Sequence, residues 1–167
     1  MTIETKIPGI TLRQATKNDV PLILQFIRGL ADYVNKSKQV VTNEQMLHET
    51  LFGDRQYAEV IIADYKHKPA GFAIFFHNYS TFQGQPGIYL EDLFVTPEFR
   101  GKWIGKTLLT YLAKLAVERN CGRFEWLTLD WNTDALEFYR SMGAIPLTGS
   151  TIQRLTSDAL ERLAEQF

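Results

Sequence analysis

The sequence predicts a mixed α/β fold, with one sheet and helices on both of its faces. Strand-like and helix-like segments follow one another along the whole chain, and no internal repeat or low-complexity tract interrupts them. With 167 residues, 45% of them hydrophobic and 22% charged, the chain has the size of one well-packed domain and is short for two. We therefore expect residues 1–167 to form a single domain.

The first third of the chain contains one expected strand and two expected helices. Residues 10–15 alternate between apolar and polar side chains as a strand does, and Asn18 and Pro21 then open a helix. Thr42, followed three residues later by Gln45, forms a capping-box pattern and predicts a second, shorter helix. The apolar face of the first helix consists of Ile23, Phe26, Ile27 and Leu30.

The middle of the chain is typical of strands. Residues 58–65 and 70–79 are rich in β-branched and aromatic side chains, and the segment "KHKPAG" between them has the length and composition of a hairpin turn, so the two strands should pair antiparallel. The Gly- and Pro-rich patch at 80–87 is eight residues long and predicts a turn or functional loop, not a linker. Residues 88–95 form the next expected strand.

The last third alternates again between helix and strand. A helix over 104–120 carries Leu108, Leu112, Leu115 and Ala116 on one side. The other expected elements are a strand over 124–130, a short helix over 133–142 that ends at Gly143, a strand near Ile152, and a terminal helix over 157–167.

Composition excludes several classes of function. Eighteen Lys and Arg residues nearly balance 19 Asp and Glu residues, so no overall charge draws the chain to nucleic acid or to an anionic membrane. The first ten residues lack a signal-peptide pattern, and no apolar stretch approaches a membrane span. Cys121 is the single cysteine and the three histidines lack metal-ligand spacing, so we expect a soluble, cytoplasmic protein without disulfides or a metal site.

The segment "EDLFVTPEFRGKWIGKTLL", residues 91–109, points to an anion site. Gly101 and Gly105 flank the residues "KWI" at the start of the expected helix. The first amides of a helix and the positive end of its dipole suit a phosphate. Arg100, Lys102 and Lys106 add positive charge. A plain glycine turn with solvated lysines is the alternative for this segment taken alone.

A nucleotide-binding P-loop is a weaker match. "GKWIGKT" is one residue shorter than the P-loop spacing, although Asp130 at the end of "FEWLTLD" resembles the acid of a second NTPase motif. The residues "TPEFR" also separate the strand from the first glycine, whereas a P-loop follows its strand almost directly. The sequence therefore favours a different phosphate-binding scheme.

A second motif, "WNTDALEFYRSMGA" at 131–144, follows about thirty residues downstream. Together the two motifs resemble the GNAT superfamily of N-acetyltransferases, and "STFQGQPGIYLEDLFV" is similar to its spermidine/spermine (diamine) acetyltransferase group. The resemblance covers essentially the whole chain and implies a splayed sheet and acetyl-CoA as co-substrate. By this resemblance the pantetheine arm binds along Leu93, Phe94 and Val95, the pyrophosphate binds the amides of Arg100, Gly101, Lys102, Trp103, Ile104, Gly105 and Lys106, and Asn132 reaches the lower part of the cofactor.

The resemblance also implies the catalytic groups. Tyr139 matches the tyrosine that protonates the departing thiolate, and Glu91 or the adjacent Asp92 matches the acid that takes a proton from the substrate amine. The chemistry needs both, because an alkylamine with a pKa of about 10 is protonated at neutral pH and cannot attack a thioester. Side chains alternate along a strand, so Glu91 and Asp92 should point to opposite faces unless a bulge intervenes. Phe82 is a candidate for lining the amine entrance.

Three departures from the family pattern bear on cofactor geometry and on the substrate. Trp103 stands where the family has a glycine, which is difficult for a side chain if the backbone needs positive φ. Val34 replaces an acid after the tyrosine of the first helix, and "GSTIQRL" replaces an acid and a tryptophan near the last strand. Long polyamines need several carboxylates, so a smaller amine or a lysine-like amino acid is at least as good a candidate as spermidine.

The sequence thus predicts direct acetyl transfer from acetyl-CoA to a small primary amine in a ternary complex. Two alternatives stay open: an acyl-CoA-binding sensor without turnover, and an enzyme that acetylates protein N-termini or lysines. Family resemblance implies a homodimer, with the C-terminal segment as one possible contact.

Overall fold

The computed structural model describes residues 2–167. The chain forms two compact units: one ends at Leu127, and the other runs from Thr128 to Phe167. The expectation of one domain over residues 1–167 stays a prediction.

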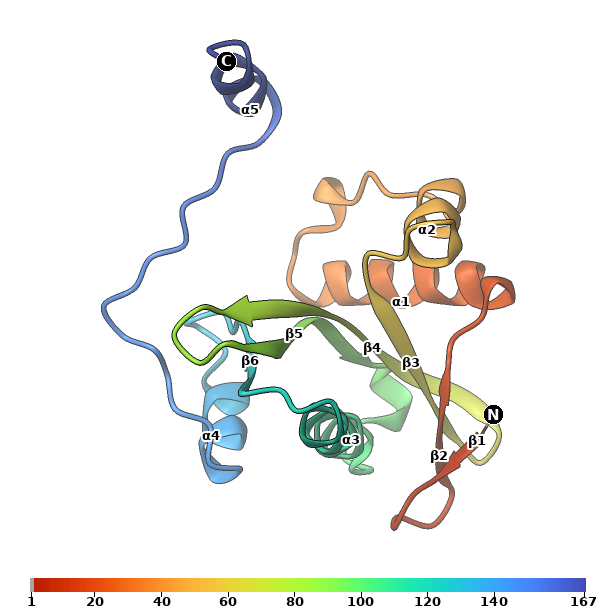
Figure 1. Ribbon diagram of the computed structural model, residues 1–167. Coiled ribbons are helices and arrows are strands. Elements are labelled where there is room, and N and C mark those ends of the chain that lie inside the picture. The colour runs from red at the N-terminus through yellow and green to blue at the C-terminus, as the bar shows by residue number, and fades with distance from the viewer. Residues whose placement is uncertain (1) are drawn as a thin grey trace. The chain divides into compact units, whose positions relative to one another are not determined.

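The first unit is built on a six-stranded sheet whose strand order follows the chain, β1-β2-β3-β4-β5-β6 (Figure 1). Neighbours from β1 to β5 pair antiparallel, whereas β5 and β6 pair parallel. The sheet is therefore mixed, as predicted. Its strands are β1 Thr2–Glu4, β2 Ile10–Gln14, β3 Glu59–Tyr65, β4 Lys68–Ser80, β5 Gln85–Val95 and β6 Arg123–Trp126.

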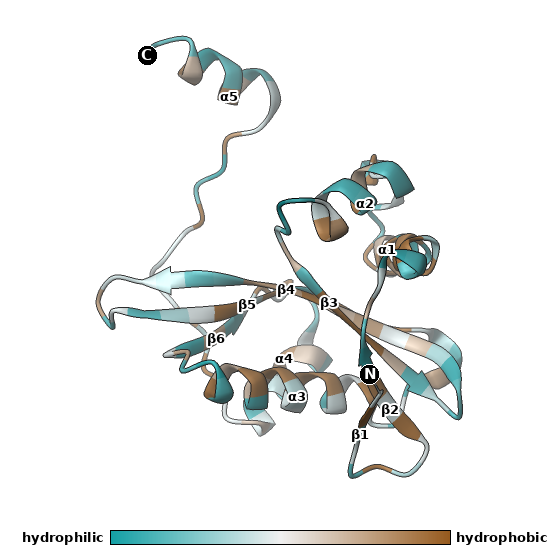
Figure 2. Cartoon of the chain, turned by 45° about the vertical axis from the view of Figure 1, so that its right-hand side comes forward, coloured by the Kyte–Doolittle hydropathy of each residue, from teal (hydrophilic) through white to brown (hydrophobic). Residues whose placement is uncertain are grey.

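Helices cover both faces of this sheet, which confirms the expected layers (Figure 1). α1 (Val20–Tyr33) and α2 (Glu44–Phe52) lie on one face, and α3 (Ile104–Glu118) lies on the other. Hydrophobic residues concentrate in the central strands that these helices sandwich (Figure 2). Short 3₁₀ turns occupy Lys17–Asp19, Ser37–Gln39 and Pro97–Phe99.

The core under α1 joins the helix to three strands. Phe26 of α1 stacks on Phe72 of β4, with ring centroids 5.2 Å apart, and lies 6.3 Å from Phe94 of β5. All three rings are buried, and Leu47 and Leu51 of α2 close the same cluster. Because aromatic rings bury large apolar areas, this cluster fixes the α1 face of β5.

Several boundaries differ from the sequence expectations. The helix cap of α2 is Asn43, not Thr42, because the Asn43 side chain accepts a hydrogen bond from the Met46 amide at 2.9 Å. The loop expected over 80–87 is shorter, since β4 continues to Ser80 and β5 begins at Gln85. The strand β1 was missed, because three residues carry too little pattern. The β3–β4 hairpin is confirmed, with its turn at Lys66 and His67.

The second unit contains α4 (Thr133–Ser141) and α5 (Ser157–Ala164). Gly143 has φ 92°, so the predicted left-handed end of the short helix is confirmed. The prediction of a strand near Ile152 is wrong, because residues 150–156 have no regular structure. The strand expected over 124–130 is also too long: it ends at Trp126. Among residues 2–167, no helix has the length and apolarity that crossing a membrane requires.

Candidate active site

A β-bulge at Glu91 shapes the centre of the candidate site. In the register of β4 and β5, Leu90 pairs with Phe75 and Asp92 pairs with Ile74, so Glu91 is an extra residue without an opposite partner. An extra residue moves the following side chains to the other face of the sheet. Asp92 therefore shares a face with Ile74, on the side that α1 covers. The alternation of side chains along the strand left open whether a bulge occurs here, and the register shows that it does. The bulge gives the two carboxylates different surroundings.

Asp92 carries the most perturbed carboxyl group of the site. Its side chain is largely removed from solvent at the edge of the core under α1, and burial raises its pKa from an ordinary 3.8 to about 6. The nearby negative charge of Glu91 raises the pKa further, as a smaller effect. Among the described residues no hydrogen-bond donor compensates this carboxyl. Glu91 itself is exposed. The pair thus combines one partly buried acid with one exposed acid.

The parallel pairing of β5 with β6 ends next to the bulge at Glu91. Pairing between β5 and β6 runs from Gly87 with Arg123 to Leu90 with Trp126, and β6 ends there. Within the described residues of the first unit, no strand pairs with β5 on its β6 side from Glu91 onward. Backbone groups on such an edge can bind an extended ligand in the manner of an added strand. The stretch of Leu93, Phe94 and Val95, predicted to bind a pantetheine arm, therefore has one open edge.

The start of α3 supplies hydrogen-bond donors for an anion. No side chain caps this helix, so the amides of its first turn, including Ile104, Gly105 and Lys106, lack an intrahelical acceptor. A methyl group placed on Gly105 would lie 3.6 Å from Leu93, so the helix start approaches β5 closely. Amides at a positive helix end are the donor set that a pyrophosphate requires. The residues present therefore fit the phosphates of acetyl-CoA.

Trp103 and Gly101 shape the loop before α3. Gly101 has φ 74° and Trp103 has φ 67°, so the positive φ suspected at the tryptophan is real. The residue that the family fills with glycine thus has a backbone conformation that favours glycine. The Trp103 side chain is 62% exposed.

The three cations of the loop have different partners. The Arg100 guanidinium lies 4.6 Å from the centroid of the Tyr33 ring, and its Nε donates to the Val95 carbonyl at 3.1 Å. Lys102 Nζ lies 5.6 Å from the Tyr65 ring centroid, whereas Lys106 Nζ lies 5.2 Å from the Trp103 ring centroid. Sequence reasoning missed both tyrosines. Only the strand and helix packing shows that they contact this loop.

Asn132 and Tyr139 belong to the second unit. The Asn132 side chain caps α4, where its Oδ1 accepts a hydrogen bond from the Ala135 amide at 3.4 Å. Tyr139 lies on α4, with its ring 5.6 Å from that of Phe138. Helix capping explains the position of Asn132 in the motif in physical terms. The roles of both residues toward a cofactor stay predictions.

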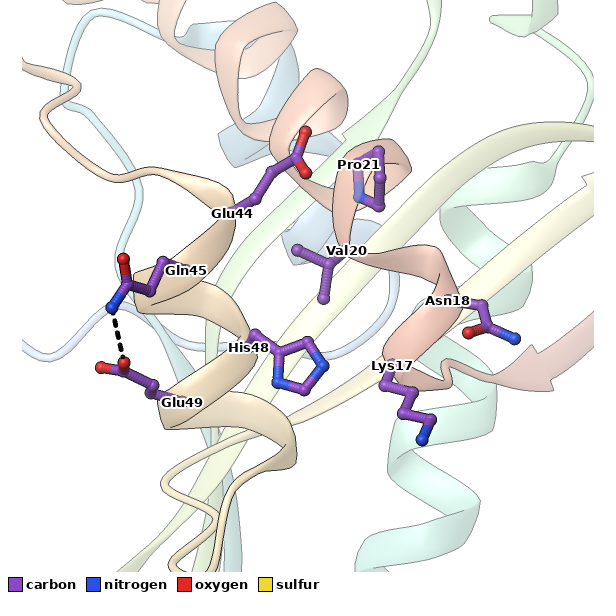
Figure 3. Close-up of a pocket in the computed structure, with 8 residues that line it drawn as sticks. All are labelled: Lys17, Asn18, Val20, Pro21, Glu44, Gln45, His48 and Glu49. Atoms are coloured by element: carbon purple, nitrogen blue, oxygen red, sulfur yellow. Dashed lines mark hydrogen bonds between the residues drawn. The ribbon is translucent and has the colours of Figure 1, made fainter.

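Two other features lie away from these residues. Phe82 is fully exposed in the turn between β4 and β5, and its role at an amine entrance stays a prediction. A surface pocket lies between the start of α1 and α2, and none of the predicted site residues lines it (Figure 3). The part of the chain that the structure describes contains no group of three His, Cys, Asp or Glu side chains able to hold a metal ion. The pocket is lined by Lys17, Asn18, Val20, Pro21, Glu44, Gln45, His48 and Glu49.

Comparisons with known proteins agree on one family. A model described as the acetyltransferase (GNAT) family matches residues 27–144. Thialysine N-epsilon-acetyltransferase from Bos taurus is 32% identical, over 93% of this chain and 97% of that protein. L-ornithine N5-acetyltransferase from Arabidopsis thaliana is 31% identical, over 91% of this chain and 86% of that protein.

Solved structures share the fold. An integron cassette protein from the mobile metagenome of V. cholerae has a TM-score of 0.79 and 29% identity, over 94% of this chain and 98% of that one. An aminoglycoside acetyltransferase from an uncultured soil metagenomic sample has a TM-score of 0.74 at 21% identity, over 89% of this chain and 97% of that one, which shows the common fold alone. The predicted fold class is confirmed.

Proposed function

This chain belongs to the acetyltransferase (GNAT) family of N-acetyltransferases, and we propose that it transfers acetyl from acetyl-CoA directly to the primary amine of a small molecule. The family implies acetyl-CoA as the co-substrate, and the uncapped amides at the start of α3 fit its phosphates. Bound there, the cofactor supplies an activated acyl group as a thioester. We expect this reaction in the cytoplasm.

The observation that carries the proposal is the position of Asp92 beside the bulge. Removing a carboxylate even partly from water costs free energy, so the fold alone does not favour an aspartate at this position. An incoming ammonium group would be that partner, since opposite charge compensates the desolvation. The exposed Glu91 next to it adds a second negative charge for the same cation.

The two carboxylates also meet the need for a base. With a pKa of about 6, Asp92 is mostly ionised at neutral pH and can pair with the ammonium group. We assign Asp92 to ammonium binding and Glu91 to proton removal through water, because only Glu91 is in open contact with solvent. The neutral amine would then attack the thioester carbonyl, and the carbon–sulfur bond would break while the thiolate takes a proton from the Tyr139 phenol. The nitrogen of the adduct would lose its second proton to solvent, and solvent would return a proton to Tyr139. This role for Tyr139 rests on the motif around it.

The substrate we favour is a lysine-like or ornithine-like amino acid or a short diamine. The two curated relatives are named for thialysine and L-ornithine, which both carry a side-chain amine. Val34 lies at the end of α1, where the diamine group usually has an acid. A long polyamine needs several carboxylates along its binding site, and this chain lacks one of them at position 34. This difference favours a ligand with one amine to be acetylated on a short chain.

Thiol release tests the activity. The protein is incubated with acetyl-CoA and with ornithine, thialysine, putrescine, spermidine or a lysine peptide, and free thiol is followed. We expect release with the small amines, lost in Tyr139→Phe, with Phe138→Leu as a neighbouring control that keeps activity. Tight acetyl-CoA binding without turnover on any amine would favour the sensor, and turnover on the peptide alone would favour a protein acetyltransferase.

We also propose a homodimer that uses the C-terminal segment. Seven large apolar side chains between residue 145 and the C-terminus are exposed, which is more than a short terminal segment usually presents to water. Sedimentation of the full chain and of a chain ending at Ala144 tests this assembly. A monomer for the full chain rejects it. The exposed residues are Ile145, Leu147, Ile152, Leu155, Leu160, Leu163 and Phe167.

A further inference from the structure

Trp103 occupies a backbone position that its side chain does not favour. Its φ of 67° and ψ of 6° are left-handed, and it is the bulkiest of the six non-glycine residues with positive φ in residues 2–167. Glycine adopts this conformation without steric cost, whereas a bulky side chain there is an outlier. The indole does not compensate by packing, because 62% of it is exposed. The fold alone therefore gives no reason for a tryptophan at this position.

The surroundings of the indole suit a phosphate-bearing aromatic ligand. Lys106 Nζ lies 5.2 Å from the ring centroid, on the first turn of α3. Arg100 and Lys102 contact Tyr33 and Tyr65 instead, so Lys106 is the cation of this loop that accompanies Trp103. An ammonium on one side of the ring leaves the other side for a flat group. The uncapped amides of α3 begin at the next residue.

The chemistry of acetyl-CoA supplies such a ligand. Its diphosphate joins two different ends, the pantetheine arm and an adenine nucleotide. If the α3 amides hold the diphosphate and the arm follows the open edge of β5, the nucleotide must leave on the solvent side of the loop. An exposed indole is a stacking surface for a purine, and Lys106 is a partner for a phosphate.

We propose that Trp103 is a nucleotide-binding residue, whose indole stacks on the adenine of acetyl-CoA while Lys106 pairs with a phosphate of the same nucleotide. This proposal rests on the proposed function, because it concerns the same co-substrate. In this proposal, the affinity of Trp103 for the nucleotide end of acetyl-CoA offsets the cost of its left-handed backbone. The indole takes no part in the acetyl transfer itself. A donor without the nucleotide, such as S-acetylpantetheine, gains nothing from the indole.

Calorimetric titration with acetyl-CoA and with adenosine 3′,5′-bisphosphate tests the proposal on the wild type and three variants. Trp103→Ala should weaken binding of both ligands about tenfold, the loss expected from removing one base–aromatic stack. Trp103→Phe keeps a ring and should retain most of the affinity. Quenching of tryptophan fluorescence by adenosine 3′,5′-bisphosphate should be present in the wild type and lost in Trp103→Phe, although that variant still binds.

Trp103→Gly separates the side chain from the backbone. It relieves the positive φ, so its melting temperature should rise, while its affinity for acetyl-CoA should fall as in Trp103→Ala. His67→Gly is the matched control: His67 has φ 64° in the β3–β4 turn, and its replacement should raise the melting temperature without changing affinity. With S-acetylpantetheine as donor, the loss of kcat/KM in the glycine and alanine variants should be smaller than with acetyl-CoA, because this donor has no nucleotide for the indole to bind.

Two results overturn the proposal. Wild-type affinity for acetyl-CoA in both Trp103→Ala and Trp103→Gly shows that the indole does not bind the nucleotide. An equal loss with acetyl-CoA and with S-acetylpantetheine shows that Trp103 acts on the shape of the loop. Failure of the proposed function looks different: the wild-type chain would then either bind neither acetyl-CoA nor adenosine 3′,5′-bisphosphate, or bind acetyl-CoA without releasing thiol with any amine.

Discussion

Replacing Asp92 with asparagine should stabilise the protein at alkaline pH. The folded structure raises the pKa of Asp92 from an ordinary 3.8 to about 6, mainly by burial. Each pKa unit corresponds to about 1.4 kcal/mol, so the ionised carboxylate costs the folded state about 3 kcal/mol. Asparagine has nearly the same shape and no charge. Asp92→Asn should therefore unfold with a free energy about 3 kcal/mol higher than the wild type at pH 8.

The sign of this effect depends on pH. Because the folded pKa is the higher one, the cost is fully present above about pH 6 and disappears as pH falls toward 3.8. At pH 5 the advantage of Asp92→Asn should be about half of its value at pH 8. Urea unfolding without ligand at the two pH values measures both quantities. Equal advantages at pH 5 and pH 8, or a less stable variant at pH 8, would refute the assignment of a desolvated carboxylate.

A carboxylate with the opposite shift provides the control. The Arg13 guanidinium hydrogen-bonds Asp19 and lowers the pKa of that carboxyl from 3.8 to about 2, with Oδ1 of Asp19 at 2.8 Å from Nη2 of Arg13. A lowered pKa stabilises the fold above pH 3.8, and this stabilisation is lost as pH falls toward 2. Asp19→Asn should therefore destabilise the protein at pH 8, in contrast to Asp92→Asn.

Three further predictions concern the reaction, the packing and one helix end. The pH profile of kcat/KM should show a rise near pH 6 that Asp92→Asn abolishes, since the ionised carboxylate binds the amine; an unchanged inflection assigns it to another group. Gly29→Ala places a methyl group 2.8 Å from the Phe94 ring and should cost about 1–3 kcal/mol in urea unfolding, whereas no loss would mean that the ring moves freely. Asn43→Ala removes the cap of α2 and should cost about 1 kcal/mol, with Thr42→Ala as the nearly neutral comparison.

The regular elements could be predicted because they depend on local periodicity. The apolar faces of α1 and α3 recur at helical spacing, and a glycine in a left-handed conformation ends the segment after α4. The strand expected near Ile152 failed for the opposite reason. A β-branched residue favours a strand only when a neighbouring strand pairs with it, and residues 150–156 form no such pair.

The sequence motifs select the residues of the candidate site, whose roles stay predictions, but they do not give its geometry. The double motif identified Glu91, Asp92 and the loop before α3, because those residue types are unusual together. The bulge depends on the register between β4 and β5, which is a property of two segments and not of one. The raised pKa of Asp92 follows from that register, because the bulge turns the side chain toward the core under α1. Pairing therefore determines which of the two acids is desolvated.

The unfavourable features of this first unit lie close together in the sequence. The bulge at Glu91, the desolvated carboxyl of Asp92, the unpaired edge of β5 and the left-handed Trp103 all fall within residues 91–103. Among the described residues, no fully buried side-chain nitrogen or oxygen lacks a hydrogen-bond partner, so the Asp92 carboxyl, which is only partly buried, keeps some contact with solvent. Local conflicts that cost stability persist where a ligand or a reaction needs them.

This clustering also bears on the choice between an enzyme and a cofactor sensor. A sensor would need the helix start and the edge of β5, which we propose as the acyl-CoA site, but it would have no use for a costly carboxylate beside them. Asparagine at position 92 would make a sensor more stable by about 3 kcal/mol at pH 8. The presence of an aspartate that lacks a hydrogen-bonding partner in the described structure therefore favours a site in which a cationic amine arrives and reacts.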